Sequence, residues 1–185
     1  MKLLVQRVTR GSVTLNKGTP EEEVIGSIGK GYVILLGISR NDYPEDVDYL
    51  VGRLCTMRML PNAEGKEWAL SLQDAQADVL IVSQFTLYGY LNGSKPDFHE
   101  AMGSGAEDLY NRFVTLTRQK LGDTHVQTGK FGTYMSVLIE NDGPATLIID
   151  SRISKYVEGA DGMSRIGGSK TFRKYQKEDN TPESK

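Results

Sequence analysis

Short segments rich in β-branched and apolar residues recur along this chain, separated by glycine, proline or polar connections. This pattern is typical of β-strands. Two longer apolar runs, 31–38 and 78–85, are typical of strands that are buried on both faces. A turn at 61–65 between two short segments also predicts a hairpin. The predicted strands are 2–8, 12–15, 23–28, 31–38, 57–60, 67–72, 78–85, 124–128, 135–140 and 145–149.

Two other segments have helical spacing. Pro44 stands in the first turn of the first helix, and Ser104 and Glu107 have the spacing of a capping box at the start of the second, which ends at Leu121-Gly122. The apolar faces are Val47, Leu50, Val51, Leu54 and Cys55 in the first helix and Leu109, Phe113 and Leu116 in the second. The order is strands, then strand and helix twice, then strands. It predicts a mixed α/β fold with both main helices on one side of the sheet.

Composition narrows the class of protein. The chain has 185 residues, of which 38% are hydrophobic and 25% charged, which suits one folded domain and excludes wholesale disorder. The longest apolar run is far too short to span a membrane, and the first residues turn polar too early for a signal peptide. One cysteine and two histidines exclude an internal disulfide and make most metal centres improbable. We expect a cytoplasmic protein with no metal and no cofactor.

Charge divides the chain in two. The formal net charge is -2, yet residues 151–185 carry eight Lys and Arg against five Asp and Glu. This part has few apolar residues and cannot bury enough surface to offset the entropy of ordering it. We therefore predict a folded domain over 1–150 and a basic, polar extension over 151–185, of which at least the last third is disordered.

Familiar catalytic motifs are absent or incomplete. No G-x-S-x-G elbow accompanies a histidine, and His99-Glu100 lacks the second histidine of a zinc protease helix. We interpret His99 and His125 as surface or structural residues and Cys55 as a buried, inert thiol on a helix face. The glycines of 26–31 precede a strand, which favours a turn over a phosphate loop.

Two segments remain that the fold alone does not explain. Ser83-Gln84-Phe85-Thr86-Leu87 stands at the end of a buried strand, where polar side chains and backbone N–H groups are well placed to bind a ligand. Asn141-Asp142-Gly143-Pro144-Ala145-Thr146 stands between two predicted strands. It has two interpretations: a plain hairpin turn, or a cis Gly-Pro bond that leaves a backbone carbonyl exposed for recognition.

Together these segments resemble the D-aminoacyl-tRNA deacylase family. The resemblance covers about residues 1–150, and the extension has no counterpart in the short bacterial members. Besides the two segments above, the matching motifs are Gln6-Arg7-Val8, Ser12-Val13, Gly26-x-Ile28-Gly29-x-Gly31, Lys95-Pro96-x-Phe98 and Gln127-Thr128-Gly129-x-Phe131-Gly132-x-x-Met135. Several ordered motifs over most of a chain are far more specific than any one of them.

The resemblance implies a barrel-like fold, with largely antiparallel strands, and an ester hydrolase that proofreads the chirality of aminoacyl-tRNA. In such an enzyme the terminal adenosine of the tRNA lies beside Ser83, Gln84, Phe85 and Thr86, the segment implied to be catalytic. The ester is already activated, so positioning and stabilisation of the oxyanion by backbone N–H groups suffice. A neighbouring ribose hydroxyl assists the attacking water. We favour a binding role for Thr86 because no base is near it in sequence.

The resemblance also implies how the substrate is selected. A cis Gly143-Pro144 segment, which Arg7 helps to hold, reaches across a homodimer interface into the site of the other subunit. Its carbonyls bind the amino group of the substrate and exclude an L side chain, which would leave glycyl-tRNA as a further substrate. Phe131 and Met135 are implied to line the adjoining pocket, although plain core packing explains them equally well.

A binding module is the competing interpretation. The basic extension, with Arg165, Lys170, Arg173, Lys174 and Lys177, offers contacts for the phosphates of RNA or DNA without catalysis. Charged tails are more often simply solvated. Hydrolysis of D-aminoacyl-tRNA but not of its L counterpart distinguishes the two.

Overall fold

A computed structural model describes residues 1–152 together with the strands β9 (Tyr156–Glu158) and β10 (Ser164–Ile166), which pair antiparallel. The disorder predicted for the end of the extension falls outside the described residues. In the described chain no helix is both long and apolar enough to cross a membrane.

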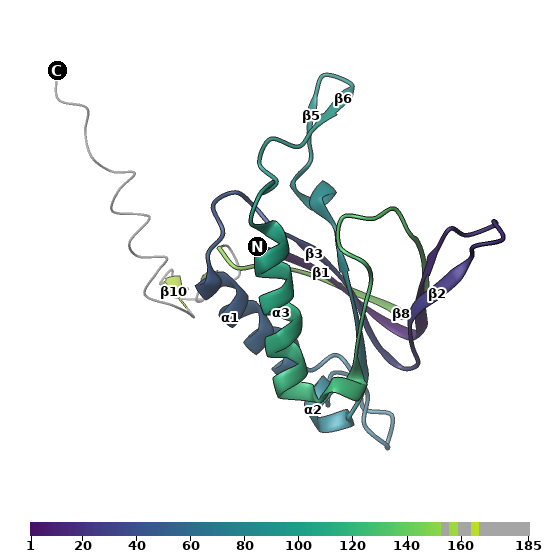
Figure 1. The fold of residues 1–185 in the computed structure, drawn as a ribbon. Helices are drawn as coiled ribbons and strands as arrows, with labels where there is room; N and C mark the ends of the chain where they lie inside the picture. Colours follow the sequence, from purple (N-terminus) through teal and green to yellow (C-terminus); the bar gives the residue numbers. More distant parts are fainter. Residues whose placement is uncertain (153–155, 159–163, 167–185) are drawn as a thin grey trace.

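The main sheet is mixed, as predicted (Figure 1). Its hydrogen-bonded order is β2 (Glu23–Ile28), β1 (Lys2–Leu15), β3 (Gly31–Gly37), β4 (Asp78–Ser83) and β7 (Val126–Thr128), and β8 (Ser136–Asp150) also pairs with β1. The partners β2, β3 and β8 run antiparallel to β1, whereas β4 is parallel to β3 and β7 is parallel to β4.

The two ends of this sheet approach each other. A Cβ at Gly26 on β2 would lie 2.8 Å from the carbonyl oxygen of Thr128 on β7, so only glycine allows this approach. The sheet thus curls into the nearly closed, barrel-like form that the family resemblance implies.

Two long helices cover one face of the sheet, again as predicted (Figure 1). They are α1 (Pro44–Thr56) and α3 (Ala106–Leu121). Their apolar residues pack with Leu3, Val5, Tyr32 and Ile34 into the larger of two core clusters. The smaller cluster, which includes Val8, Val13, Val33 and Leu80, lies on the opposite face inside the curved sheet.

Several predicted boundaries are wrong. Segments 2–8 and 12–15 form one strand, β1, and segments 135–140 and 145–149 form one strand, β8. The pairing between β1 and β8 shifts its register between Gln6 and Arg10 of β1, and the two strands are paired on both sides of this shift. The predicted hairpin around 61–65 is reduced to a single bridge between Leu60 and Leu70.

Two helix starts also differ from prediction. Gly105, with a φ of 85°, occupies the N-cap of α3 without a side-chain cap, so the capping box of Ser104 and Glu107 does not form. A short helix, α2 (Leu72–Ala75), begins in a segment predicted as strand. Ser71 caps it by accepting from the backbone N–H of Asp74 at 3.1 Å.

A buried ion pair joins the start of the chain to the loop before α1. The terminal ammonium of Met1 lies 2.6 Å from Oδ1 of Asp42 and donates to Oγ of Ser151 at 2.8 Å. The other oxygen of Asp42 accepts the N–H of Ser39 at 2.6 Å. Burial raises the pKa of Asp42 and lowers that of the ammonium. This cluster fixes the loop that leaves β3.

Candidate active site

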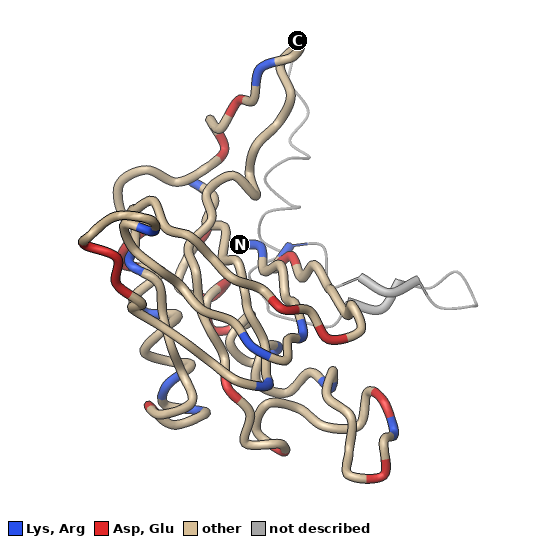
Figure 2. Tube along the Cα trace, turned by 90° about the vertical axis from the view of Figure 1, so that its right-hand side faces the viewer, with Lys and Arg blue, Asp and Glu red and all other residues tan. Residues whose placement is uncertain are grey.

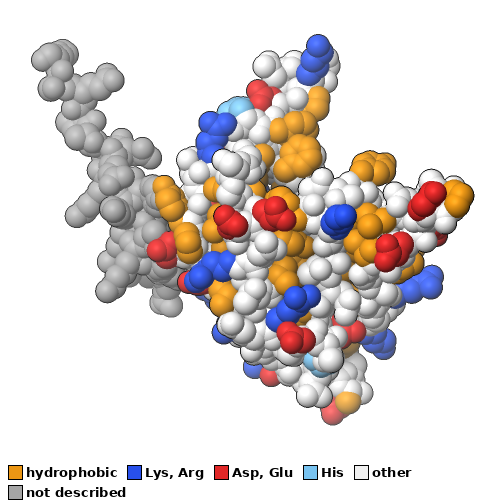
Figure 3. Space-filling view, in the orientation of Figure 1, with side chains coloured by type: hydrophobic (Ala, Val, Ile, Leu, Met, Phe, Trp, Pro, Cys, Tyr) orange, Lys and Arg blue, Asp and Glu red, His pale blue; other side chains and the backbone are white. Residues whose placement is uncertain are grey.

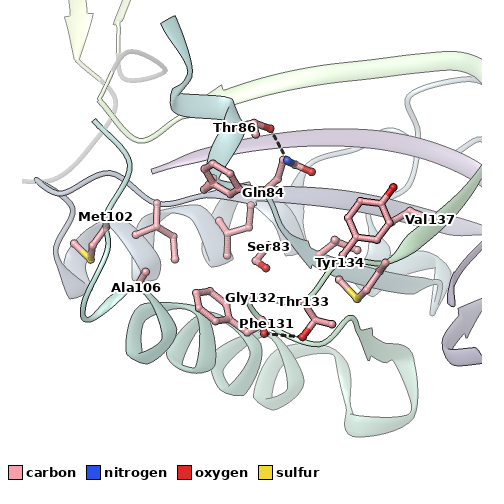
Figure 4. A pocket seen from close by; sticks show the side chains of 15 residues that line it. Ser83, Gln84, Thr86, Met102, Ala106, Phe131, Gly132, Thr133, Tyr134 and Val137 are labelled. Atoms are coloured by element: carbon pink, nitrogen blue, oxygen red, sulfur yellow. Dashed lines mark hydrogen bonds between the residues drawn. The ribbon is translucent and has the colours of Figure 1, made fainter. Parts of the chain in front are cut away.

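A cavity of about 530 Å³ opens where the parallel strands β3 and β4 end, beside the segment that follows β7 (Figure 4). Ligands of open α/β sheets commonly bind at this carboxyl edge. The lining residues come from four places in the sequence, and they are Leu36, Ile38, Val82, Ser83, Gln84, Phe85, Thr86, Met102, Ala106, Phe131, Gly132, Thr133, Tyr134, Met135 and Val137.

One wall of the cavity is the segment predicted from the end of the buried strand. The N–H of Gln84 donates to the carbonyl of Leu36 at 2.8 Å, which fixes the chain as it enters the 3-10 helix η1 (Phe85–Tyr88). In the described chain, the N–H groups of Phe85 and Thr86 have no backbone acceptor, as expected at the start of a helix. This wall therefore offers two neighbouring backbone donors.

Side chains of the same wall are oriented by each other. The amide Nε2 of Gln84 donates to Oγ1 of Thr86, and Ser83 points into the space between η1 and the opposite wall (Figure 4). An amide N–H group cannot remove a proton from the hydroxyl that it donates to. This contact supports binding by Thr86 rather than nucleophilic attack.

The opposite wall is the segment after β7. The N–H of Gly129 donates to the carbonyl of Ile81 at 2.9 Å, and Phe131 then lies against Tyr110 of α3, with ring centroids 5.3 Å apart. Met135 packs against the smaller core cluster while its sulfur accepts the N–H of Lys130 at 3.2 Å. Both predicted residues therefore line the cavity and pack on the core at once.

The cavity is uncharged. None of its lining residues is acidic, basic or a histidine. Within the described residues no group of three or more His, Cys, Asp and Glu is placed to hold a metal ion. The lining can bind an apolar or aromatic group and can donate hydrogen bonds from backbone and amide N–H groups, and it contains no group that titrates near neutral pH.

The other predicted site residues lie together elsewhere. The guanidinium of Arg7 is buried, and its Nε donates to the carbonyl of Asp142 at 3.2 Å. Its Nη1 donates to the carbonyl of Met59 at 2.9 Å and contacts Oε2 of Glu67 at 2.5 Å. Arg7 thus ties the Gly143-Pro144 segment to the loop after α1.

The Gly143-Pro144 bond is cis, as the second interpretation of this segment predicted. The alternative interpretation as a hairpin turn is wrong, because the segment lies within the single strand β8. Gly143 has a φ of 122°, and a Cβ there would lie 2.7 Å from the backbone nitrogen of Ala145. Both features require glycine.

The cavity and the Gly143-Pro144 segment lie apart in one chain. Arg7 pairs with Tyr32 near the start of β3, whereas the cavity is lined by Leu36 and Ile38 at and beyond the end of that strand. Leu36 and Ile38 are four and six residues beyond Tyr32, so at about 3.3 Å per residue they lie roughly 13–20 Å from it along the strand direction. One chain therefore does not bring the two sets of predicted residues together.

The residues set aside from catalysis lie away from the cavity. Cys55 is buried on α1, and burial raises its pKa to about 11, which fits an inert thiol. His99 is exposed and contacts Asp97 and Glu100, and His125 lies 2.9 Å from Asp78.

The sequence did not predict part of the cavity lining. Met102, which precedes α3, and Ala106, its first residue, also line the cavity, and no sequence pattern marks them because their place depends on how that helix packs. Thr133 and Tyr134 stand inside a matching motif, so their proximity to Phe131 and Met135 was the available signal.

Comparison with known proteins gives consistent matches. Residues 4–150 match the family model described as D-Tyr-tRNA(Tyr) deacylase. D-aminoacyl-tRNA deacylase 1 of Danio rerio is 43% identical over 152 residues, covering 82% of this chain and 71% of the relative. D-aminoacyl-tRNA deacylase of Clostridium acetobutylicum is 43% identical over 154 residues, covering 82% and 98%.

Two solved structures are also similar. One, named c-Myc DNA Unwinding Element Binding Protein, is 43% identical with a TM-score of 0.75 and covers 81% of this chain and 98% of its own. The other, described as a probable eukaryotic D-amino acid tRNA deacylase, has a TM-score of 0.68 over 80% of this chain and 97% of its own. At 20% identity it shows the fold alone.

Proposed function

Because this chain belongs to the D-Tyr-tRNA(Tyr) deacylase family, we propose that it hydrolyses the ester of D-aminoacyl-tRNA and releases free D-amino acid and tRNA. One observation carries the proposal. The two stretches 83–86 and 131–135, distant in sequence, form opposite walls of one uncharged cavity large enough for a nucleoside.

The terminal adenosine occupies this cavity, with its base against the aromatic and apolar lining of Phe131 and Met135. The ester carbonyl then lies beside η1, where the free N–H groups of Phe85 and Thr86 stabilise the oxyanion that forms when water adds. The ester C–O bond breaks and the ribose oxygen takes up a proton. Gln84 and Thr86 position the substrate through their mutual hydrogen bond.

An uncharged lining fits this chemistry. An aminoacyl ester is activated, so the protein needs to supply positioning and oxyanion stabilisation rather than a nucleophile or a strong base. A ribose hydroxyl next to the ester orients the attacking water, so the RNA supplies part of the catalytic apparatus. A lining in which no side chain titrates near neutral pH supports this division of roles.

Chirality is read by the Gly143-Pro144 segment. Its main-chain carbonyls bind the substrate amino group and leave no space for a side chain in the L position. Selection by exclusion depends little on which D-amino acid is attached. It also admits glycyl-tRNA, because glycine has no side chain to exclude.

Two copies of the chain complete the site. The separation of roughly 13–20 Å along β3 supports an arrangement in which the Gly143-Pro144 segment serving one cavity comes from a second copy. The strand that carries it, β8, also has apolar side chains exposed to solvent in one copy, including Ile148 at 70% and Leu147 at 42%. Exposed apolar side chains on this strand are of the kind that a second copy would cover, which supports a two-fold dimer.

Binding of DNA without hydrolysis is the second candidate. It is favoured by the similarity to the solved structure named as a DNA unwinding element binding protein. Against it, the Lys and Arg residues of the described chain are scattered over the body in the view of Figure 2 rather than gathered into one basic band.

A single experiment tests the proposal. The protein is incubated with D-tyrosyl-tRNA and L-tyrosyl-tRNA, ester loss is followed, and sedimentation is measured at the same concentration. We expect rapid loss of the D-ester only, from a dimer. Equal rates on both esters would contradict chiral selection, and activity of a monomer would contradict a site shared between two copies.

A further inference from the structure

A two-stranded hairpin rises directly from the rim of the cavity and projects away from the body (Figure 1). It consists of β5 (Tyr90–Asn92) and β6 (Lys95–Asp97). The chain enters it from Thr86 and leaves it toward Met102, and both of these residues line the cavity. The hairpin is therefore an extension of the cavity wall.

The base of the hairpin is fixed to that wall. The ring of Phe98 lies edge-on to Phe85, with centroids 5.0 Å apart. The N–H of Arg40 donates to the carbonyl of Glu100 at 3.1 Å, and that of Met102 donates to the carbonyl of Ile38 at 2.9 Å. A molecule held in the cavity thus has the hairpin at a defined position beside it.

The two faces of the hairpin differ in chemistry. Residues opposite each other in an antiparallel pair project to the same side, and alternate residues share a side. Tyr90 pairs with Asp97 and Asn92 with Lys95, so these four residues form one face, here called the Tyr90 face. Leu91 and Pro96 form the other face.

The acid and the cation of the Tyr90 face have different surroundings. The carboxylate of Asp97 accepts from the backbone N–H and the ring Nδ1 of His99, both at 2.8 Å, and Glu100 contacts the other ring nitrogen at 3.0 Å. Within the described chain Lys95 has no ion pair, and it is the first residue of β6, next to the turn at the outer end of the hairpin. Figure 3 shows a basic side chain at this tip, with hydrophobic side chains below it.

The ring of Tyr90 is available for stacking. Its side chain is 51% exposed, and its ring lies 6.2 Å from that of His99. An exposed aromatic ring, an amide and an unpaired cation on one face are the groups by which proteins bind unpaired nucleotides. Bases stack on the ring, and phosphates contact the cation.

We propose that the Tyr90 face binds the unpaired nucleotides that precede the terminal adenosine of aminoacyl-tRNA. This inference rests on the proposed function, because the adenosine in the cavity places the adjoining nucleotides at the rim. The base of a preceding nucleotide stacks on Tyr90, and Lys95 contacts a phosphate farther along the strand. The hairpin thereby recognises RNA without taking part in the reaction.

The test compares two substrates. D-tyrosyl-tRNA reaches the hairpin, whereas D-tyrosyl-adenosine fills only the cavity. The double variant Tyr90→Ala, Lys95→Ala is measured beside Leu91→Ala, a matched control on the opposite face whose side chain is 80% exposed. All these side chains are on the surface of the hairpin, and equal activity on D-tyrosyl-adenosine verifies that each variant is folded.

We expect the double variant to lose about ten- to hundredfold in kcat/KM on D-tyrosyl-tRNA, which corresponds to one lost stacking contact. Its activity on D-tyrosyl-adenosine and both activities of Leu91→Ala stay within about twofold of wild type. Lys95→Ala alone lowers the slope of log kcat/KM against log salt by about 0.7, as expected for one lost phosphate contact.

Other results overturn the inference. An unchanged rate on D-tyrosyl-tRNA, or an equal loss on both substrates, would show that the hairpin does not bind the RNA. Dissociation of the dimer in the double variant would assign the face to a second copy. If the wild type hydrolyses neither substrate, the proposed function has failed. In that case tRNA binding tests the role of the hairpin separately: the double variant should bind labelled, uncharged tRNA at least about tenfold more weakly than the wild type.

Discussion

Replacement of Gly143 by alanine is the sharpest test of chiral selection. The added Cβ would lie 2.7 Å from the backbone nitrogen of Ala145 and 3.5 Å from Nη2 of Arg7. The first contact is with backbone and cannot be relieved by a side-chain rotation. The φ of 122° is also one that residues with a Cβ rarely adopt. The segment must therefore move.

The structure gives the size of the effect. Holding a residue other than glycine in such a conformation costs about 1–3 kcal/mol, and the contact with Ala145 adds to it. A displaced segment no longer presents its carbonyls at the position that excludes an L side chain. Each 1.4 kcal/mol of lost discrimination lowers the ratio of D to L rates about tenfold. We expect Gly143→Ala to lower that ratio about ten- to hundredfold and to lower the free energy of unfolding by about 1–3 kcal/mol.

The assay follows ester loss from D-tyrosyl-tRNA and L-tyrosyl-tRNA, with urea unfolding measured in parallel. Gly18→Ala is the matched control, because Gly18 has a φ of 83° and open space where a Cβ would be. It imposes a backbone penalty of about 1 kcal/mol far from the segment and leaves the D-to-L ratio unchanged. A folded, dimeric Gly143→Ala protein with the wild-type ratio would refute the assignment.

Three further substitutions or deletions test the support of the site. Arg7→Lys cannot reproduce the forked contacts of the guanidinium, so we expect the free energy of unfolding to fall by about 2 kcal/mol and the ratio of D to L rates to fall with it. Urea unfolding and paired rate measurements check this, and no change in either quantity would contradict it. Asp42→Asn leaves the buried ammonium of Met1 without an anion and should lower the free energy of unfolding by about 3 kcal/mol, whereas a loss below about 1 kcal/mol in urea would show that the pair is dispensable. Removal of 160–185 should leave the free energy of unfolding and the rate at saturating tRNA unchanged, and should weaken tRNA binding only at low salt. A truncated protein that unfolds would show that this part packs on the body.

The elements were largely predictable, and the errors share one cause. Gly11 and Gly143-Pro144 are residues that normally interrupt strands, so the sequence pattern divides β1 and β8 at these points. In the structure Gly11 itself pairs with Ile139, and the two strands pair with each other on both sides of Gly143-Pro144. Pairing between residues more than a hundred positions apart overrides the local preference, and no local pattern reports it.

The site was predictable where it depends on the end of a strand. Ser83 to Thr86 follow a buried strand, and the carboxyl edge of parallel strands is where the cavity lies. Met102 and Ala106 could not be placed, because the start of α3 depends on Gly105 in a left-handed conformation rather than on the expected cap at Ser104. A capping motif shows where a helix can begin, and tertiary packing determines where it does begin.

The distance between the cavity and Gly143 has a consequence for how catalysis and selection are divided. The cavity has an uncharged lining that, in the proposed function, positions an activated ester. The Gly143-Pro144 segment is held by Arg7 at the other end of β3 and contributes no group to the lining. In the proposed dimer, changes at Gln84 or Thr86 therefore lower the D and L rates together. Changes at Arg7 or Gly143 alter their ratio, because in the proposal that segment is the part of the site that excludes an L side chain.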